Sequence, residues 1–223
     1  LAAAKLYIPI AHVEGGVRLA TWNPEEMNRR VVDTLSDLIF CPTPRSLASL
    51  EKEHVKGKGL FVGDTMLDLV HMVARLPARA DSIKSSLGAA RGSYVLVTLH
   101  RAENTAEPKR LLAMLDHIVR ESGGRRIIFP AHPRTVKFCA ANRIDLSRFE
   151  VVKPVGYLDM FDLLADAAAV FTDSGGLQKE AFFHKVPCTL MYDESPWPET
   201  IEAGWNRLWN GPPYAPRKDV NPF

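Results

Sequence analysis

Short apolar runs alternate with amphipathic segments along all 223 residues, and this alternation limits the folds open to the chain. Several runs are apolar throughout, which predicts strands buried on both faces. The predicted strands are residues 6–13, 38–41, 59–62, 94–98, 126–130, 150–153, 169–172 and 188–191. The predicted helices are residues 24–35, 44–54, 65–76, 108–120, 136–142 and 158–167. Such alternation favours an α/β fold with parallel sheets and right-handed crossovers.

A change of composition between residues 76 and 91 predicts a domain boundary, because PARADSIKSSLGAARGS is richer in Ala, Ser, Gly and charge than its flanks. We therefore expect one Rossmann-like domain over residues 1–80 and a second over residues 92–223. Ligands of such folds bind at the carboxyl ends of the strands, so a cleft between the domains is the expected site. The chain begins without Met and ends without a closing helix, so we expect a longer protein whose first domain is incomplete here.

Composition excludes several classes of partner. The 28 basic and 26 acidic side chains give a net charge of only +2, which argues against a nucleic-acid partner. No apolar run approaches the ~20 residues that span a membrane. The cysteines Cys41, Cys139 and Cys188 are odd in number and form no CxxC pair, so neither a zinc site nor a disulfide framework is expected. A cytoplasmic location is the prediction that fits these features.

The stretch FTDSGGLQKEAFFHK, residues 171–185, is the most specific site signal. A strand leads through Asp-Ser-Gly-Gly into a helix, and the free N–H groups at a helix start bind anions. Ser174 and the N–H groups of Gly175 and Gly176 are therefore candidate phosphate ligands, and Glu180 could reach ribose hydroxyls. The stretch is neither a P-loop nor GxGxxG. A plain tight turn between strand and helix is the alternative.

Polar groups also follow other predicted strands or open the helix at 24–35. Glu14 follows the first strand and Glu25 opens the next helix, so the two carboxylates could converge for proton transfer. The alternatives are a turn carboxylate at Glu14 and a complement to the helix dipole at Glu25. His100 and Arg101 suit a diphosphate, with a solvated loop as alternative. His132 lies between Pro130 and Pro133, which predict a rigid turn, so its role could be structural.

The motifs AHVEGGVR, NPEEMNRR, VTLHRAEN, HPRT and TDSGGLQKEA together resemble the non-hydrolysing UDP-N-acetylglucosamine 2-epimerases, from residue 1 to about 210. The resemblance implies a GT-B fold with two Rossmann-like domains, an interdomain cleft and, here, an incomplete N-terminal domain. It implies reversible conversion of UDP-GlcNAc to UDP-ManNAc by UDP elimination and re-addition, for polysaccharide biosynthesis. It also implies a cytoplasmic homodimer that needs no nicotinamide, other cofactor or metal.

Roles follow from the resemblance position by position. The catalytic residues that it implies are Glu14, Glu25 and His100. The substrate-binding residues that it implies are Arg101, Val155, Met160, Ser174, Gly175, Gly176 and Glu180, with Val155 and Met160 beside the uracil. Some bacterial members bind a second UDP-GlcNAc as activator next to the substrate, and Arg101 and His132 are the candidate residues for such a site here. Tyr192 stands where many relatives have Arg, which removes a positive charge that could face the substrate.

Three alternatives remain beside the non-hydrolysing epimerase. A hydrolysing epimerase would release free ManNAc and UDP, although the PEEMNRR segment fits the non-hydrolysing branch better. A GT-B glycosyltransferase shares the fold with little motif support. A non-catalytic module that binds UDP-sugars through residues 155–180 would show no turnover.

Overall fold

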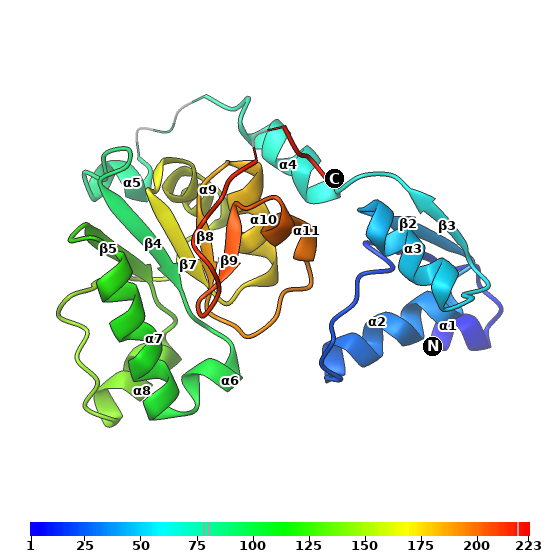
Figure 1. The fold of residues 1–223 in the computed structure, drawn as a ribbon, viewed down its shortest axis with the longest axis horizontal. Coiled ribbons are helices and arrows are strands. Elements are labelled where there is room, and N and C mark those ends of the chain that lie inside the picture. Colours follow the sequence, from blue (N-terminus) through cyan, green and yellow to red (C-terminus); the bar gives the residue numbers. More distant parts are fainter. Residues whose placement is uncertain (78, 80, 218) are drawn as a thin grey trace.

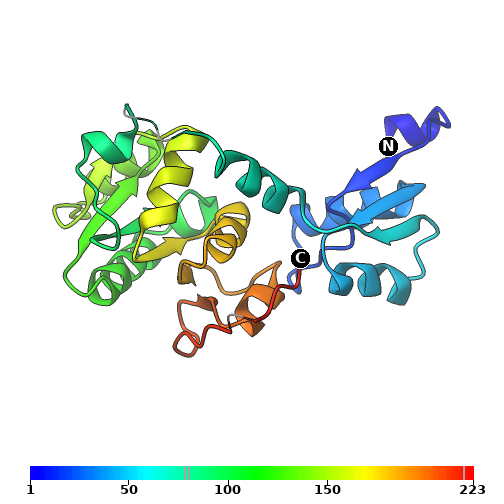
Figure 2. The ribbon, with the colours of Figure 1, turned by 90° about the horizontal axis from the view of Figure 1, so that it is seen from above.

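The computed structural model describes residues 1–77, 79, 81–217 and 219–223. These residues form two lobes of different size, each built around a parallel sheet (Figure 1). The smaller lobe holds a three-stranded sheet and the larger lobe a six-stranded sheet. Helix α4 (Thr65–Val73) lies on the path between them (Figure 2).

The smaller sheet has the order β1-β2-β3, in which the strands are Ala11–Val13, Leu38–Cys41 and Lys58–Phe61. Helices α1 (Ala2–Lys5), α2 (Pro24–Leu35) and α3 (Pro44–Lys52) complete this lobe. The start of α2 follows the sequence signal, since the Asn23 side chain accepts a hydrogen bond from Glu26 N at 2.9 Å and Pro24 takes the first helical position.

The larger sheet has the order β6-β5-β4-β7-β8-β9, with all neighbours parallel. Its strands are Tyr94–Thr98 (β4), Arg126–Pro130 (β5), Glu150–Val152 (β6), Ala169–Thr172 (β7), Cys188–Leu190 (β8) and Asn206–Leu208 (β9). Counted within this lobe, the order is 3-2-1-4-5-6, the order of a Rossmann fold. Successive strands are added toward one edge of the sheet up to β6 and toward the other edge from β7 onward. The switch point between β4 and β7 is therefore the expected ligand crevice.

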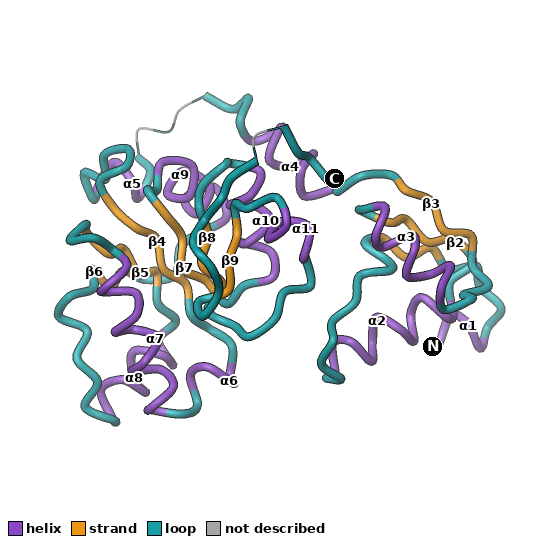
Figure 3. Tube along the Cα trace, in the orientation of Figure 1, coloured by secondary structure: helices purple, strands orange, loops and turns teal. Residues whose placement is uncertain are grey.

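Both faces of the larger sheet are covered by helices (Figure 3). Val95 and Val97 of β4 pack in one core cluster with residues of α7 (Pro108–Glu121) and α8 (Pro133–Ala141). Tyr94 and Leu96 point into a second cluster with residues of α9 (Tyr157–Asp166) and α10 (Gly175–Phe183). Burial on both sides explains why these strands read as continuous apolar runs.

Short helices occupy the remaining connections. They are α5 (Ile83–Ser86), α6 (Ala102–Thr105) and α11 (Pro198–Glu202). Helix α11 and the segment before it contact the smaller lobe, where Glu199 accepts a hydrogen bond from the Thr43 hydroxyl at 2.8 Å. Glu194 likewise accepts hydrogen bonds from the backbone of Ala20 and Thr21, both at 3.1 Å. None of the described helices combines the length and apolar character needed to cross a bilayer.

One predicted strand was wrong in its bounds, and one strand was not predicted. The strand expected over residues 6–13 begins only at Ala11. Pro9 lacks the N–H that a ladder needs, and Tyr7 has a left-handed φ of 56°, so the chain turns before the strand. Strand β9 was not predicted, because Asn206-Arg207-Leu208 is short and largely polar.

The proposed division into residues 1–80 and 92–223 stays a prediction. The expected end of the first domain at residue 80 falls on a position outside the described residues.

Candidate functional site

The carboxyl ends of β4 and β7 lie next to each other, and the hydroxyls of Thr98 and Thr172 are 2.6 Å apart. Two of the predicted site segments leave the sheet here. Residues 99–104 follow β4, and residues 173–176 follow β7. The topology thus brings the His100-Arg101 pair to the Ser-Gly-Gly turn, although some seventy residues separate them in the sequence.

Asp173 is the centre of this pair of loops, and the sequence analysis did not select it. Its buried carboxylate, only 3% exposed, accepts hydrogen bonds from the backbone N–H groups of His100 and Arg101 at 3.1 and 2.9 Å. The Asn104 side chain donates to the same carboxylate at 3.1 Å. One acid therefore shapes the whole loop that carries His100 and Arg101.

The same carboxylate tunes the imidazole of His100. The Nδ1 atom of His100 lies 3.1 Å from Asp173 Oδ1, and this hydrogen bond raises the pKa of His100 above its ordinary value. Burial alone would raise the pKa of Asp173, but the hydrogen bonds from His100, Arg101 and Asn104 outweigh it and lower that pKa. The loop therefore presents a histidine that holds its positive charge more readily than a free one.

Ser174 caps α10, since its hydroxyl accepts a hydrogen bond from Leu177 N at 3.2 Å. The other N–H groups of the first helical turn have no carbonyl within the helix to bind. They belong to Gly175 and Gly176, at the end of the helix that carries the positive pole of its dipole. This arrangement leaves two N–H donors at a helix start, and an anion bound there stays a prediction.

Packing does not require glycine at these two positions. Neither Gly175 nor Gly176 has a positive φ. A Cβ added at Gly175 would meet no atom closer than 3.9 Å, and one added at Gly176 none closer than 3.5 Å. Neither backbone strain nor a neighbouring atom therefore explains the missing side chains, whereas close approach by a ligand would explain them.

The glycines of the HVEGG motif are different. A Cβ at Gly15 would lie 2.2 Å from the Ile39 side chain, and one at Gly16 would lie 2.2 Å from the Ser46 carbonyl. Gly16 also has a φ of +77°. These two glycines are therefore explained by the packing of the smaller lobe itself.

A pocket of about 530 Å³ opens at the switch point, a volume in the range of small-molecule sites. The predicted site residues that line it are His100, His132, Val155, Met160, Ser174, Gly176 and Glu180. Its lining is mainly apolar at Val155 and Met160 and polar along the helix start. Tyr157 and Met66 also line it, and the sequence analysis did not select them.

Glu180 is 8% exposed and lies at the wall of this pocket. Burial raises the pKa of Glu180, against the hydrogen bond from Tyr157 and the charge of Lys179. A buried acceptor of this kind suits the hydroxyls of a bound ligand, which would replace the water that burial removes.

Arg101 points from the larger lobe toward the smaller one. Its Nε donates to the Asp173 carbonyl at 2.8 Å, and its Nη2 lies 3.8 Å from a carboxylate oxygen of Glu25. The guanidinium also lies over the Tyr192 ring, 4.7 Å from its centroid. Glu25 forms its closer ion pair with Arg29, at 2.7 Å, so the pair with Arg101 is the looser one.

The neighbouring acid, Glu26, has a structural role. Its side chain is 1% exposed, accepts a hydrogen bond from Leu19 N at 2.8 Å and pairs with Arg30 at 2.7 Å. Of the two adjacent acids at the start of α2, the half-exposed Glu25 is therefore the one free to meet a substrate.

Glu14 follows β1 and is the other predicted carboxylate. It has a left-handed φ of 67°, which is costly for a residue with a side chain. Its carboxylate forms an ion pair with Lys179 of α10. Among the described residues no hydrogen bond or ion pair joins Glu14 to Glu25, so their convergence on one substrate stays a prediction.

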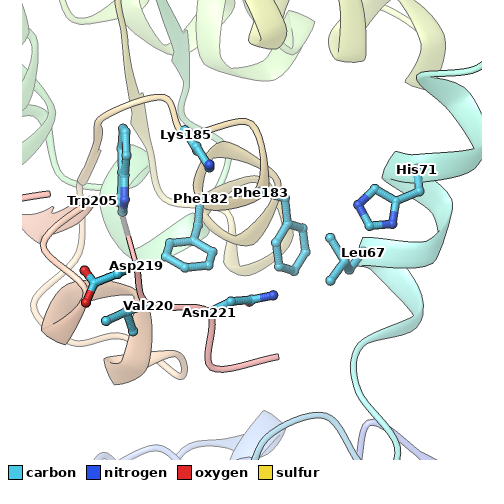
Figure 4. Close-up of a pocket in the computed structure, with 9 residues that line it drawn as sticks. All are labelled: Leu67, His71, Phe182, Phe183, Lys185, Trp205, Asp219, Val220 and Asn221. Atoms are coloured by element: carbon cyan, nitrogen blue, oxygen red, sulfur yellow. The ribbon is translucent and has the colours of Figure 1, made fainter. Parts of the chain in front are cut away.

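A separate pocket of about 250 Å³ lies away from the switch point (Figure 4). Leu67 and His71 of α4 form one wall, and Phe182 and Phe183 of α10 form the opposite wall. Near the C-terminus, the Phe223 ring packs 5.1 Å from that of Phe183. No predicted site residue lines this pocket, so we do not place the proposed chemistry there.

Within the described part of the chain, no three His, Cys, Asp or Glu side chains gather closely enough to hold a metal ion. The three cysteines are free and buried, as small apolar side chains would be.

The chain matches a known protein family over most of its length. Residues 1–215 match the family model described as UDP-N-acetylglucosamine 2-epimerase. The chain is 38% identical over 215 residues to a UDP-N-acetylglucosamine 2-epimerase homolog of Methanococcus maripaludis, covering 93% of this chain and 60% of that protein. It is 40% identical over 213 residues to the UDP-2,3-diacetamido-2,3-dideoxy-D-glucuronate 2-epimerase of Pseudomonas aeruginosa, covering 93% and 58%.

A solved structure agrees. The UDP-GlcNAc 2-epimerase of Methanocaldococcus jannaschii, in complex with UDP-GlcNAc and UDP, superposes with a TM-score of 0.81 at 35% identity. The match covers 92% of this chain and 59% of that one. The chain thus spans 58–60% of the length of these relatives.

Proposed function

The chain belongs to the UDP-N-acetylglucosamine 2-epimerase family, and on this basis we propose that the complete protein interconverts UDP-GlcNAc and UDP-ManNAc by inverting C2. Its two parallel sheets are those of a GT-B fold. The hexose would lie between the lobes, with the nucleotide in the pocket at the end of β4 and β7.

The two glycines at the start of α10 carry the proposal. Gly175 and Gly176 leave room that neither packing nor φ requires, at a helix N-terminus that attracts an anion. A diphosphate that approaches these N–H groups explains both facts. His100 and Arg101 stand beside this seat, where positive charge would stabilise the leaving diphosphate. Val155 and Met160 would contact the uracil, and Glu180 the ribose.

The proposed chemistry is an elimination followed by an addition. A carboxylate, Glu14 or Glu25, takes the C2 proton, and the C–H electron pair forms a C1–C2 double bond. The C1–O bond breaks, and its electron pair leaves with UDP. UDP then adds back to C1 of the 2-acetamidoglucal, while C2 receives a proton on the opposite face. All atoms and electrons balance without an oxidant or reductant.

The identity of the sugar has a second candidate. The 40% identical relative from P. aeruginosa acts, by its name, on a UDP-2,3-diacetamido glucuronate, and its identity to this chain is comparable to that of the M. maripaludis protein, at 38%. Both substrates carry a 2-acetamido group beside the anomeric carbon, so the same C2 chemistry serves either. The substituents at C3 and C6 would then decide between them.

Several finer points are carried over from the family resemblance and stay proposals. They are the homodimer, the cytoplasmic location and a role in polysaccharide biosynthesis. Activation by a second UDP-GlcNAc near Arg101 and His132 is a proposal of the same kind.

Nuclear magnetic resonance of the reaction mixture tests the function. The complete protein is incubated with UDP-GlcNAc, and in parallel with UDP-2,3-diacetamido-2,3-dideoxy-D-glucuronate, and the anomeric protons and phosphorus signals are followed. We expect the C2 epimer of one substrate to appear up to an equilibrium, with the diphosphate still attached. Accumulation of free UDP and ManNAc would indicate hydrolysis, and binding of UDP without turnover would indicate a non-catalytic module.

A further inference from the structure

Lys179 is a buried cation that the mechanism above does not use. It lies on α10, one turn beyond Gly175, and its side chain is 2% exposed. Its ammonium pairs with Asp64 Oδ2 at 2.8 Å and with the Glu14 carboxylate. The Trp197 ring covers it, with the nitrogen 4.0 Å from the ring centroid.

Asp64 alone balances the charge of this cation. A buried ammonium is tolerated where an opposite charge lies beside it, and the Asp64 side chain is equally buried at 2% exposure. The other oxygen of Asp64 caps α4 by accepting a hydrogen bond from Met66 N at 2.8 Å, so the carboxylate is held in place. Lys179 and Asp64 therefore form a neutral pair by themselves.

Glu14 is then an additional partner that charge balance does not require. Its side chain is 49% exposed, so water could solvate the carboxylate without any help from the protein. Instead, its backbone adopts a left-handed φ of 67°, and one of its oxygens contacts Lys179. Glu14 thus has a strained backbone, and its exposed carboxylate is held by Lys179 although water could solvate it. This combination indicates that the position of the carboxylate matters.

The ion pair between Lys179 and Glu14 connects the two lobes. Glu14 belongs to the smaller lobe, whereas Lys179 and the glycine seat at Gly175 and Gly176 belong to the same helix of the larger lobe. Lys179 lies four positions after Gly175 in the helix, which is about 6 Å of rise. The helix that would hold the diphosphate therefore also sets where the carboxylate stands.

We propose that Lys179 is a positioning residue for Glu14. Its ammonium holds Oε1, and the second carboxylate oxygen stays available to exchange a proton with C2 of the sugar. This inference rests on the proposed function, because it takes Glu14 to be one of the reacting carboxylates.

The test separates two roles of Lys179, which are to position Glu14 and to neutralise the buried Asp64. Lys179→Met removes the anchor but also leaves Asp64 buried without a partner, so this variant should lose both thermal stability and activity. The double variant Lys179→Met, Asp64→Asn restores neutrality, and Asn still caps α4. It should regain most of the melting temperature, while kcat stays at least about 30-fold below that of the wild type, because a misplacement of about 1 Å can cost 100-fold in rate.

The split between kcat and KM decides the outcome. With the diphosphate seat intact, we expect KM of the double variant to stay within about threefold of the wild type, since orientation rather than binding is lost. A double variant that regains kcat together with its stability would overturn the proposal, and so would a loss confined to KM. A wild-type protein that exchanges no hydrogen at C2 would instead refute the proposed function, and this inference with it.

Discussion

Replacing Asp173 by Asn tests whether one buried carboxylate organises the phosphate end of the site. The substitution keeps the shape of the side chain but turns one acceptor oxygen into an NH2 donor and removes the charge. In the structure, backbone N–H groups of His100 and Arg101 and the side chain of Asn104 all donate to this carboxylate. At least one donor would therefore face another donor in the variant.

The expected loss of stability follows from these contacts. A hydrogen bond to a charged group contributes about 1.5–3 kcal/mol, and a buried donor without a partner costs about 1–3 kcal/mol. Since Asn retains one oxygen for the remaining donors, we expect a net loss of about 2–4 kcal/mol. For a chain of this size, roughly 2–4 °C of melting temperature are lost for each kcal/mol.

The imidazole of His100 gives a second and more specific readout. Asp173 is the main cause of its raised pKa, so the pKa of His100 should fall in the variant. Because the pKa in the folded state is raised, the cation contributes fully below the ordinary histidine pKa, and its contribution is lost as pH rises through the raised value. In the variant that loss should occur at lower pH.

Thermal unfolding and an NMR titration of the histidine ring protons measure both effects. Asp193→Asn is a matched control, because it removes the same charge from an acid that pairs with Arg110 at the surface, where the ion pair contributes little. An unchanged pKa of His100 in Asp173→Asn, or a melting temperature equal to that of the control, would refute the role given to Asp173.

Two further predictions concern α10, which begins at Gly175 and carries Glu180 at the wall of the pocket. Gly175→Ala should keep or slightly raise the melting temperature, because the structure has space for the methyl group and Ala favours a helix, while calorimetry should show UDP binding weakened by about tenfold or more. Equal loss of stability and affinity would mean that the glycine serves packing. Glu180→Gln should raise the melting temperature at neutral pH, because burial raises the pKa of Glu180 and the wild type loses stability as pH rises from the ordinary glutamate pKa through that raised value. The same variant should bind UDP more weakly than the wild type, and unchanged affinity would remove Glu180 from the site.

Local patterns were enough to predict the α/β class and most of the helices. Strands 94–98, 126–130 and 169–172 coincide with β4, β5 and β7, because their apolar runs are buried on both faces. Asn23-Pro24 likewise placed the start of α2, since capping is a local interaction. Prediction failed where the strand was only three residues long and largely polar, as in β9.

The candidate site could be predicted where polar residues follow a buried strand. Ser174, Gly176, His100 and Glu180 line one pocket, as their places after strands or on the following helix indicated. Asp173 carried the same signal, a polar residue at the end of a buried strand, and could have been selected by it. Its role was hidden because its partners lie about seventy residues earlier.

Lys179 had no local signal at all. In sequence it is an ordinary helical lysine between Gln178 and Glu180. Its partners Asp64 and Glu14 are 115 and 165 residues away, so only the arrangement of the two lobes reveals that it is buried. Long-range charge pairs of this kind depend on the tertiary fold and leave no trace in periodicity or spacing.

The most direct test of the central claim is hydrogen exchange at C2. The complete protein is incubated with UDP-GlcNAc in D2O, and the recovered nucleotide sugars are analysed by mass spectrometry and proton NMR. Removal and return of the C2 proton predict one deuterium at C2 of the UDP-ManNAc formed, and a rate of incorporation that falls sharply in Glu14→Gln. An epimerised product that carries no deuterium at C2 would contradict the account.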